Sequence, residues 1–287
     1  MFNKRHIVRT IAATVSILAL SFTAACGSGQ STASNSTDSD DITQQTYKPG
    51  KLTIATGQPA YEPWVMNDKP ESGEGYEAAV AYAVADKLGF KKSDVVWTRT
   101  AFDTAIAPGA KDWDFNIQQF GITDERKKAV DFSSSYYNDS QSVVVKKDSK
   151  FANATKVSDL KDATVGVMVG TLAYDYAKAN IKDDIQTFND DAALAQALDA
   201  GQIDALVTST VECVYMVQSE QVKDAKVLGR LPDSEDKSGM SIVLPKDSKL
   251  TAAVTKAVDD LNADGTIKKL QDKWLAEYTT DLTELKK

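Results

Sequence analysis

Short apolar runs alternate with stretches of helical spacing in the first half of the folded chain. The runs have the length and composition of buried strands, and the stretches between them repeat apolar residues every three or four positions. Strands are predicted at residues 52–56, 95–97 and 113–117, and helices at residues 76–88 and 102–106. Because strands and helices alternate, this segment is predicted to form a parallel sheet covered by helices.

The same alternation recurs in a second segment of similar size. Strands are predicted at residues 163–168, 184–188 and 203–207, and helices at residues 171–179 and between Asn189 and Gly201. The two segments share a pattern but no evident sequence repeat. The chain is therefore predicted to contain two α/β units.

Two strand-like runs connect the predicted units. Residues 142–146 lead from the first unit into the second, and residues 239–244 lead back, which makes a two-segment hinge. The predicted fold class is α/β, a two-lobed clamshell whose lobes are each a mainly parallel sheet flanked by helices. Lobe 1 is predicted at residues 47–143 and 239–287, and lobe 2 at residues 144–238. Such folds bind ligands at the carboxyl ends of strands and between domains, so a cleft site is expected.

The N-terminus has the pattern of a processing signal, predicted at residues 1–25. Three basic residues precede an apolar stretch at residues 11–22, and small residues follow it. A permanent transmembrane anchor is the alternative, which the length disfavours because a bilayer crossing takes about 20 apolar residues. The protein is therefore expected to be exported.

Small residues directly before Cys26 resemble a bacterial lipobox, in which the cysteine is acylated. Thr23 departs from that pattern, which prefers leucine, so release by an ordinary signal peptidase is the alternative. Residues 26–46 are polar and without periodicity, and they are predicted to form a disordered tether. The resemblance implies a lipoprotein anchored to the outer face of the cell membrane.

Charge and residue usage exclude several classes of function. Removing the signal removes Lys4, Arg5, Arg9 and no acidic residue, which takes the formal net charge from −8 to −11 and disfavours nucleic acid as a partner. The single histidine, His6, lies in the signal, which excludes mechanisms based on a Ser-His-Asp or Cys-His set and disfavours a zinc catalytic site. No metal or cofactor is expected. Cys213 has no disulfide partner if Cys26 is acylated, and it is predicted to be a small buried residue.

From residue 52 to about residue 275, the chain resembles the polar-amino-acid family of bacterial extracellular solute-binding proteins, family 3. The strongest stretch is residues 121–133, Gly-Ile-Thr-Asp-Glu-Arg-Lys-Lys-Ala-Val-Asp-Phe-Ser, which looks like the family's T-x-x-R-x-x-x-V-x-F-[ST] signature. Tyr61-Glu-Pro-Trp64 and residues 165–171 also match. The resemblance implies a periplasmic-binding-protein-like clamshell of type II.

The resemblance assigns Arg126 to the ligand's α-carboxylate, which a guanidinium fork matches in shape and charge. The alternative is a surface arginine among charged neighbours. Gly170 and Thr171 would supply the second lobe's grip on the same group, because free N–H groups at a helix start favour an anion. The alternative for that pair is an ordinary turn with Thr171 as helix cap.

Further positions match residues that line the pocket in the family. Gly121 would let the backbone approach the ligand, and of Gln118 and Gln119 one is expected to reach the ligand while the other braces the loop. The remaining matches are Phe120, Tyr61, which is expected to contact ligand, and Trp64, for which core packing is the alternative.

Ser209 departs from the family pattern, which usually places an aspartate there to hold an α-ammonium. A buried ammonium needs an opposite charge, which a serine does not supply. Glu212 could reach the site if Thr210 begins a helix. The alternatives are that Glu212 lies on a solvated helix face, or that the ligand has no conventional α-ammonium.

The resemblance implies a non-enzymatic, monomeric binding protein of an ABC importer, which captures an amino acid or related carboxylate and delivers it to the permease. Two alternatives stay open at this stage: a ligand-gated sensor that uses the same clamshell, and a dehydratase-type enzyme in which carboxylates act as acid and base.

Overall fold

The computed structural model describes residues 41–279 and 282–287. The predicted signal and the predicted acylation of Cys26 lie outside these residues, as does most of the predicted tether. Within these residues, no helix is long and apolar enough to cross a bilayer. Residues 41–46, which composition assigns to the tether, are folded: Asp41 caps a short 3-10 helix, and the Thr46 hydroxyl donates to the backbone oxygens of Thr43 and Lys48.

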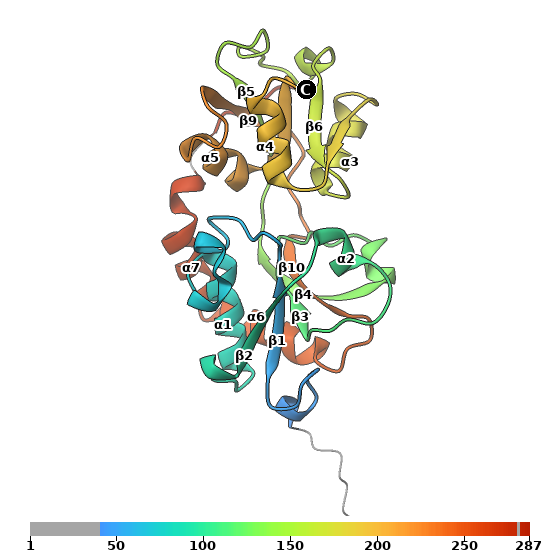
Figure 1. Ribbon diagram of the computed structural model, residues 1–287, viewed down its shortest axis with the longest axis vertical. Coiled ribbons are helices and arrows are strands. Elements are labelled where there is room, and N and C mark those ends of the chain that lie inside the picture. The colour runs from blue at the N-terminus through green and yellow to red at the C-terminus, as the bar shows by residue number, and fades with distance from the viewer. Residues whose placement is uncertain (1–40, 280–281) are drawn as a thin grey trace, which may run out of the picture. The chain divides into compact units, whose positions relative to one another are not determined.

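The first sheet has the strand order β2-β1-β3-β10-β4 (Figure 1). β1, β2 and β3 are parallel, as predicted, whereas β10 runs antiparallel to both of its neighbours. The strands are β1 (Leu52–Thr56), β2 (Val95–Arg99), β3 (Phe115–Asn116), β4 (Val130–Tyr137) and β10 (Met240–Pro245). Four helices accompany this sheet: α1 (Tyr76–Lys87), α2 (Phe102–Ile106), α6 (Thr251–Ala263) and α7 (Thr266–Trp274).

The start of α1 depends on a glycine. Gly75 has φ 98°, and a side chain there would come within 2.5 Å of the Trp64 carbonyl oxygen. This close approach lets Tyr76, Val80 and Val84 pack into the core between α1 and the sheet, where all three are fully buried. The helix predicted from the spacing of these apolar residues is confirmed.

The second sheet has the order β7-β6-β8-β5-β9. Here too one strand, β5, runs antiparallel to both of its neighbours, and the other four strands share one direction. Its strands are β5 (Gln141–Lys146), β6 (Val165–Met168), β7 (Gln186–Phe188), β8 (Ala205–Ser209) and β9 (Ala225–Arg230). Its helices are α3 (Leu172–Asn180), α4 (Asp191–Asp199) and α5 (Thr210–Gln218). Separate apolar clusters lie on its two faces, and Cys213 is buried in one of them, as predicted.

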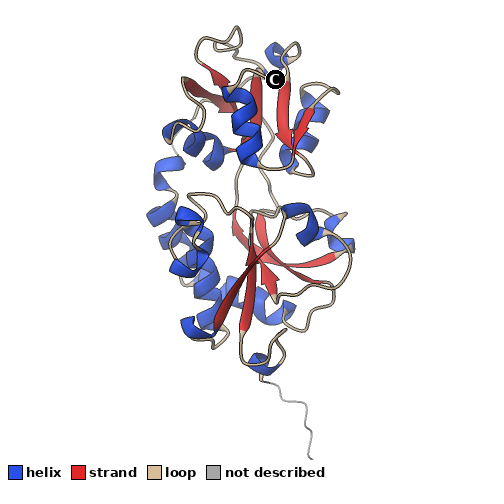
Figure 2. Cartoon of the chain, in the orientation of Figure 1, coloured by secondary structure: helices blue, strands red, loops and turns tan. Residues whose placement is uncertain are grey.

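Two segments connect the sheets (Figure 2). Residues 138–140 join β4 to β5, and residues 231–239 join β9 to β10. The segments contact each other through a hydrogen bond from Asp236 N to Asp139 O, 2.9 Å. All of β5 pairs within the second sheet. We therefore place the lobe boundaries within these two segments, and not after residues 143 and 238 as predicted. The two-lobed α/β fold predicted from the sequence is confirmed, and one antiparallel strand in each sheet, β10 and β5, makes both sheets mixed.

The last described residues lie against the second lobe, although the tail from residue 239 onward was expected with the first. Leu285 packs into a core cluster of the second sheet, and Arg230 N donates to Thr283 O at 2.9 Å. A side chain at Gly229 would lie 2.5 Å from that same Thr283 oxygen, so a glycine at this position makes room for the tail. Helices α6 and α7 do pack on the first lobe, as expected.

Short 3-10 helices complete the described chain: η1 (Ile42–Gln44), η2 (Met66–Asp68), η3 (Pro70–Ser72), η4 (Lys92–Asp94), η5 (Arg126–Lys128), η6 (Val157–Leu160) and η7 (Ala276–Tyr278).

Candidate functional site

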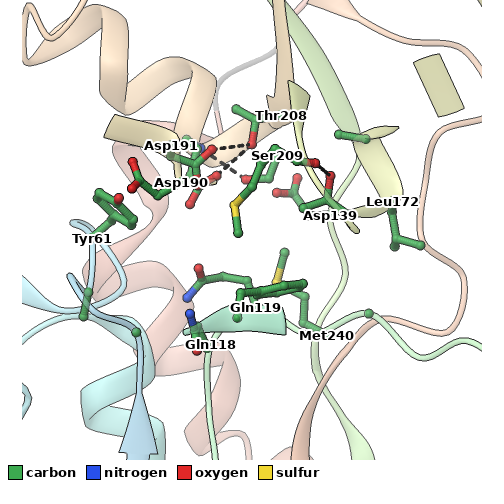
Figure 3. Close-up of a pocket in the computed structure, with 18 of the residues that line it drawn as sticks. Tyr61, Gln118, Gln119, Asp139, Leu172, Asp190, Asp191, Thr208, Ser209 and Met240 are labelled. Atoms are coloured by element: carbon green, nitrogen blue, oxygen red, sulfur yellow. Dashed lines mark hydrogen bonds between the residues drawn. The ribbon is translucent and has the colours of Figure 1, made fainter. Parts of the chain in front are cut away.

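A cavity of about 240 Å³ lies between the carboxyl ends of the parallel strands of both sheets. Tyr61, Gln118 and Gln119 line it from the first lobe, and Thr208 and Ser209 face them from the second (Figure 3). Its charged lining residues are one arginine and five carboxylates: Arg126, Asp139, Asp190, Asp191, Glu212 and Asp236. The cavity therefore offers one site for an anion in mainly acidic surroundings.

Arg126 lies in η5, and its side chain is buried, with 9% of the residue exposed. Its Nη1 donates to Gly121 O at 2.5 Å and its Nη2 to Gly170 O at 2.8 Å, so the guanidinium joins the two lobes. Burial lowers the pKa of Arg126, which the more distant charges of Asp175 and Asp236 partly offset. Among the described residues, no carboxylate forms an ion pair with it. The surface alternative for Arg126 is excluded.

Gln118, Gln119 and Gly121 all line the cavity. Gln119 has φ 50°, and its backbone N–H donates to Glu77 Oε1 at 2.7 Å. Its side-chain amide and the Tyr136 hydroxyl donate to the same Glu77 carboxylate, which is fully buried. Burial raises the pKa of Glu77 to about 7, against the effect of these hydrogen bonds. Glu77 thus fixes the loop, and Gln119 is the glutamine that braces it.

Gly121 leaves room for Leu172 from the other lobe and for Asp236 from the segment that joins the sheets. A Cβ at this position would lie 2.6 Å from Leu172 Cδ1 and 2.7 Å from Asp236 Oδ2. The missing side chain therefore lets the start of α3 come close to the Arg126 loop.

Trp64 and Phe120 do not line the cavity, in contrast to the expectation from the family pattern. Trp64 is fully buried, with ring centroids 5.6 Å from Tyr137 and 6.0 Å from Tyr76. Phe120 is also fully buried and stacks on Phe102 at 4.6 Å. Both side chains belong to the core, because the chain turns them away from the cavity.

Tyr61 lines the cavity, as expected, and its hydroxyl accepts a hydrogen bond from Ala192 N in the second lobe at 3.4 Å. Burial raises the pKa of Tyr61, and nearby carboxylates including Asp190 add to the shift. Its aromatic ring and hydroxyl thus stand at the acidic side of the cavity.

Thr171 caps α3: its hydroxyl accepts from Tyr174 N at 3.3 Å and donates to Met168 O at 2.8 Å. The residue also lines the cavity, whereas Gly170 contributes its carbonyl to Arg126. Both interpretations of the Gly170–Thr171 turn are therefore compatible, since the cap uses the hydroxyl and leaves backbone donors at the helix start.

Thr210 begins α5, and Glu212 is buried in the cavity wall with 6% exposed. The solvated-face alternative for Glu212 is therefore wrong. Ser209 caps this helix by accepting from Glu212 N at 3.3 Å. The Thr208 hydroxyl lies 2.9 Å from Glu212 Oε2 and 3.5 Å from Asp191 Oδ1. Burial raises the pKa of Glu212, and the neighbouring charges of Asp191 and Asp139 add to the shift.

The sequence prediction missed five acidic residues. Asp139, Asp190, Asp191 and Asp236 line the cavity, and Glu77 lies behind it. Asp191 comes two residues after Asn189, the predicted helix cap, and directly after Asp190, which caps α4 in the structure, so its place at a strand-to-helix turn was an available signal. Asp139 lies in the segment between the sheets and carries no periodic signal.

Two lobes joined by two segments, with an inter-lobe cavity that holds a buried unpaired arginine, define a clamshell solute-binding protein. Sequence comparison agrees: the profile of bacterial extracellular solute-binding proteins, family 3, matches residues 52–277. The chain belongs to this family, whose members are extracytoplasmic.

Curated relatives are binding proteins rather than enzymes. The L-arginine-binding protein of Pseudomonas aeruginosa is 29% identical over 245 residues, which cover 80% of this chain and 88% of the relative. The L-cystine-binding protein TcyJ of Escherichia coli is 29% identical over 222 residues, or 77% and 81% of the two chains.

A solved structure with the same fold is that of the ancestral amino acid-binding protein AncCDT-1, described as a precursor of cyclohexadienyl dehydratase. It is 30% identical, with a TM-score of 0.66 over 79% of this chain and 96% of that one.

Proposed function

We propose that this protein captures an amino acid between its two lobes and delivers it to the permease of an ABC importer. The buried, unpaired guanidinium of Arg126 carries the proposal. A charge removed from water without a counter-charge is costly, so a carboxylate ligand would stabilise it strongly. Two of the guanidinium's five N–H donors reach backbone oxygens, one from each lobe, and the others remain for a ligand.

The same arrangement supports lobe closure driven by ligand. A ligand shifts the balance between open and closed forms only through a difference in affinity, which contacts with both lobes provide. Here Arg126 comes from the first lobe, and the α3 start at Thr171 comes from the second. The closed form would be the one that docks on the permease.

We propose further that the protein acts as a monomer held on the outer face of the membrane by a lipid on Cys26, after removal of residues 1–25. Support comes from the basic start, the short apolar stretch and the small residues before Cys26. We propose no reaction for the cavity, in keeping with relatives that are binding proteins. No histidine follows residue 6 to serve as acid or base.

Isothermal titration of the exported chain with the twenty amino acids, L-ornithine and L-cystine tests the ligand class. We expect at least one to bind with a dissociation constant of about 1 µM or tighter, which corresponds to about −8 kcal/mol. Binding by none of them, at concentrations up to about 1 mM, would contradict the proposal. Loss of uptake of the same amino acid on deletion of the gene tests the transport role.

A further inference from the structure

Asp139 carries a buried carboxylate oxygen that lacks a well-formed hydrogen bond. The residue is 8% exposed and lines the cavity from the segment that joins β4 to β5. Its Oδ1 accepts from Ser140 N at 2.7 Å, whereas its Oδ2 has no hydrogen bond of good geometry from the described residues. A buried polar atom without a partner costs about 1–3 kcal/mol, and a charged one costs more. Donors of Ser209 and of the α5 start lie near this carboxylate, yet none forms a well-aligned hydrogen bond to Oδ2, so this oxygen keeps capacity for a ligand donor.

Position 209, next to Asp139, brings no charge. β5 pairs with β8 so that Gln141 lies opposite Ser209, and Thr210 N donates to Ser140 O at 2.9 Å. This pairing sets Asp139 beside the start of α5 and next to Ser209 on the cavity wall (Figure 3). The Ser209 oxygen already accepts from Glu212 N, so its capacity for a cation is limited.

Among the residues that the structure describes, no basic side chain neutralises this part of the cavity. In the described part of the chain, neither Asp139, Asp191 nor Glu212 forms an ion pair with a lysine or arginine. Burial raises the pKa of Asp139 to about 6, and the nearby donors of Ser140, Ser209 and the start of α5 offset this shift only in part. The described acidic residues also do not form a group of three or more that could hold a metal ion. The missing counter-charge is therefore best met by an organic cation.

We infer that Asp139 binds the α-ammonium group of the ligand whose carboxylate Arg126 binds, in place of an acidic residue at position 209. This inference rests on the proposed function and specifies it: the cavity takes an α-amino acid, with the anionic end at Arg126 and the cationic end at Asp139. Glu212, which the Thr208 hydroxyl holds in the same wall, adds a second carboxyl group near that end. The arrangement favours an α-amino acid over the corresponding acid without its amino group.

The test compares each amino acid with its deamino analogue on the wild type and on Asp139→Asn. The probe pairs are L-arginine with 5-guanidinopentanoate, L-glutamine with 5-amino-5-oxopentanoate, L-cystine with 3,3′-dithiodipropionate, and the equivalent pair for any other amino acid that binds. Asparagine keeps an oxygen that can accept from Ser140 N and removes only the charge. We expect Asp139→Asn to weaken amino-acid binding about 100-fold, and to change binding of the deamino analogue by less than about threefold.

Two further variants complete the design. Adding Ser209→Asp to Asp139→Asn returns a carboxylate to the neighbouring position, and we expect it to restore most of the lost affinity. Asp272→Asn, on the exposed surface of α7, makes the same change in net charge away from the cavity and should leave both affinities unchanged. If Asp139→Asn does not fold, Asp139→Ser replaces it, because its hydroxyl can also accept from Ser140 N.

The outcomes separate this inference from the proposed function. A wild type that binds no amino acid contradicts the proposed function. If the wild type binds an amino acid, the proposed function stands. The role of Asp139 is then overturned if Asp139→Asn binds that amino acid as tightly as the wild type does, or if it loses the same affinity for the amino acid and for its deamino analogue.

Discussion

Arg126→Ala is expected to lower amino-acid affinity about 1000-fold, the largest effect of any single substitution in the cavity. The change removes the only cation among the described residues that line the cavity and leaves the ligand carboxylate without a charged partner. Arg126→Lys keeps the charge but loses the planar fork, and we expect it to lose about 100-fold. Calorimetric titration with the amino acid that the wild type binds measures both losses.

Lys127→Ala is the matched control for this prediction. It removes one positive charge from the adjacent residue, whose side chain is 56% exposed and pairs with Asp124 on the surface. We expect its affinity to stay within about twofold of the wild type, since exposed pairs contribute little. Equal affinities for Arg126→Ala and the wild type would contradict the carboxylate role of Arg126.

The protonation of Asp139 by itself is expected to lower ligand affinity about tenfold between about pH 7.5 and pH 5. The pKa of Asp139 is raised to about 6 in the free protein, so this group gains its proton as the pH falls through 6. An ammonium binds the ionised carboxylate, and binding must then release that proton. The raised pKa values of Asp191 and Glu212, which have burial as their main cause, act in the same direction.

Other charged groups around Asp139 also bear on this pH dependence. The charge on Glu212 faces it from α5, Asp236 and Arg126 line the same cavity, and Glu77 lies behind the glutamine loop. No histidine lies beyond residue 6.

Titrations in two buffers of different ionisation enthalpy measure the protons released on binding, and Asp139→Asn should reduce that release. Affinity that is constant or rises toward pH 5 would contradict the prediction.

The predictable part of the site consists of residues whose role depends on local sequence. The family signature pointed to Arg126, and a helix start at Thr210 was the condition for Glu212 to reach the site; both residues line the cavity. The two-lobed fold followed from two runs of alternating strands and helices, because those periods reflect burial on one face.

The remainder depends on tertiary contacts that no local pattern encodes. Asp139 reaches the cavity only because β5 pairs with β8 in one register, and residues 138–140 have no periodicity of their own. Trp64 and Phe120 match family positions, yet chain direction after β1 and β3 turns them into the core. The tail docks on β9 through Leu285 and the space at Gly229, which are far apart in sequence.

A crystal structure of the exported protein with its amino acid bound tests the central claim most directly. We expect the ligand carboxylate on the Arg126 guanidinium, close to the start of α3 at Thr171, and the ammonium about 3 Å from Asp139 Oδ2. A ligand bound outside this cavity, or one whose carboxylate lies away from Arg126, would contradict the claim.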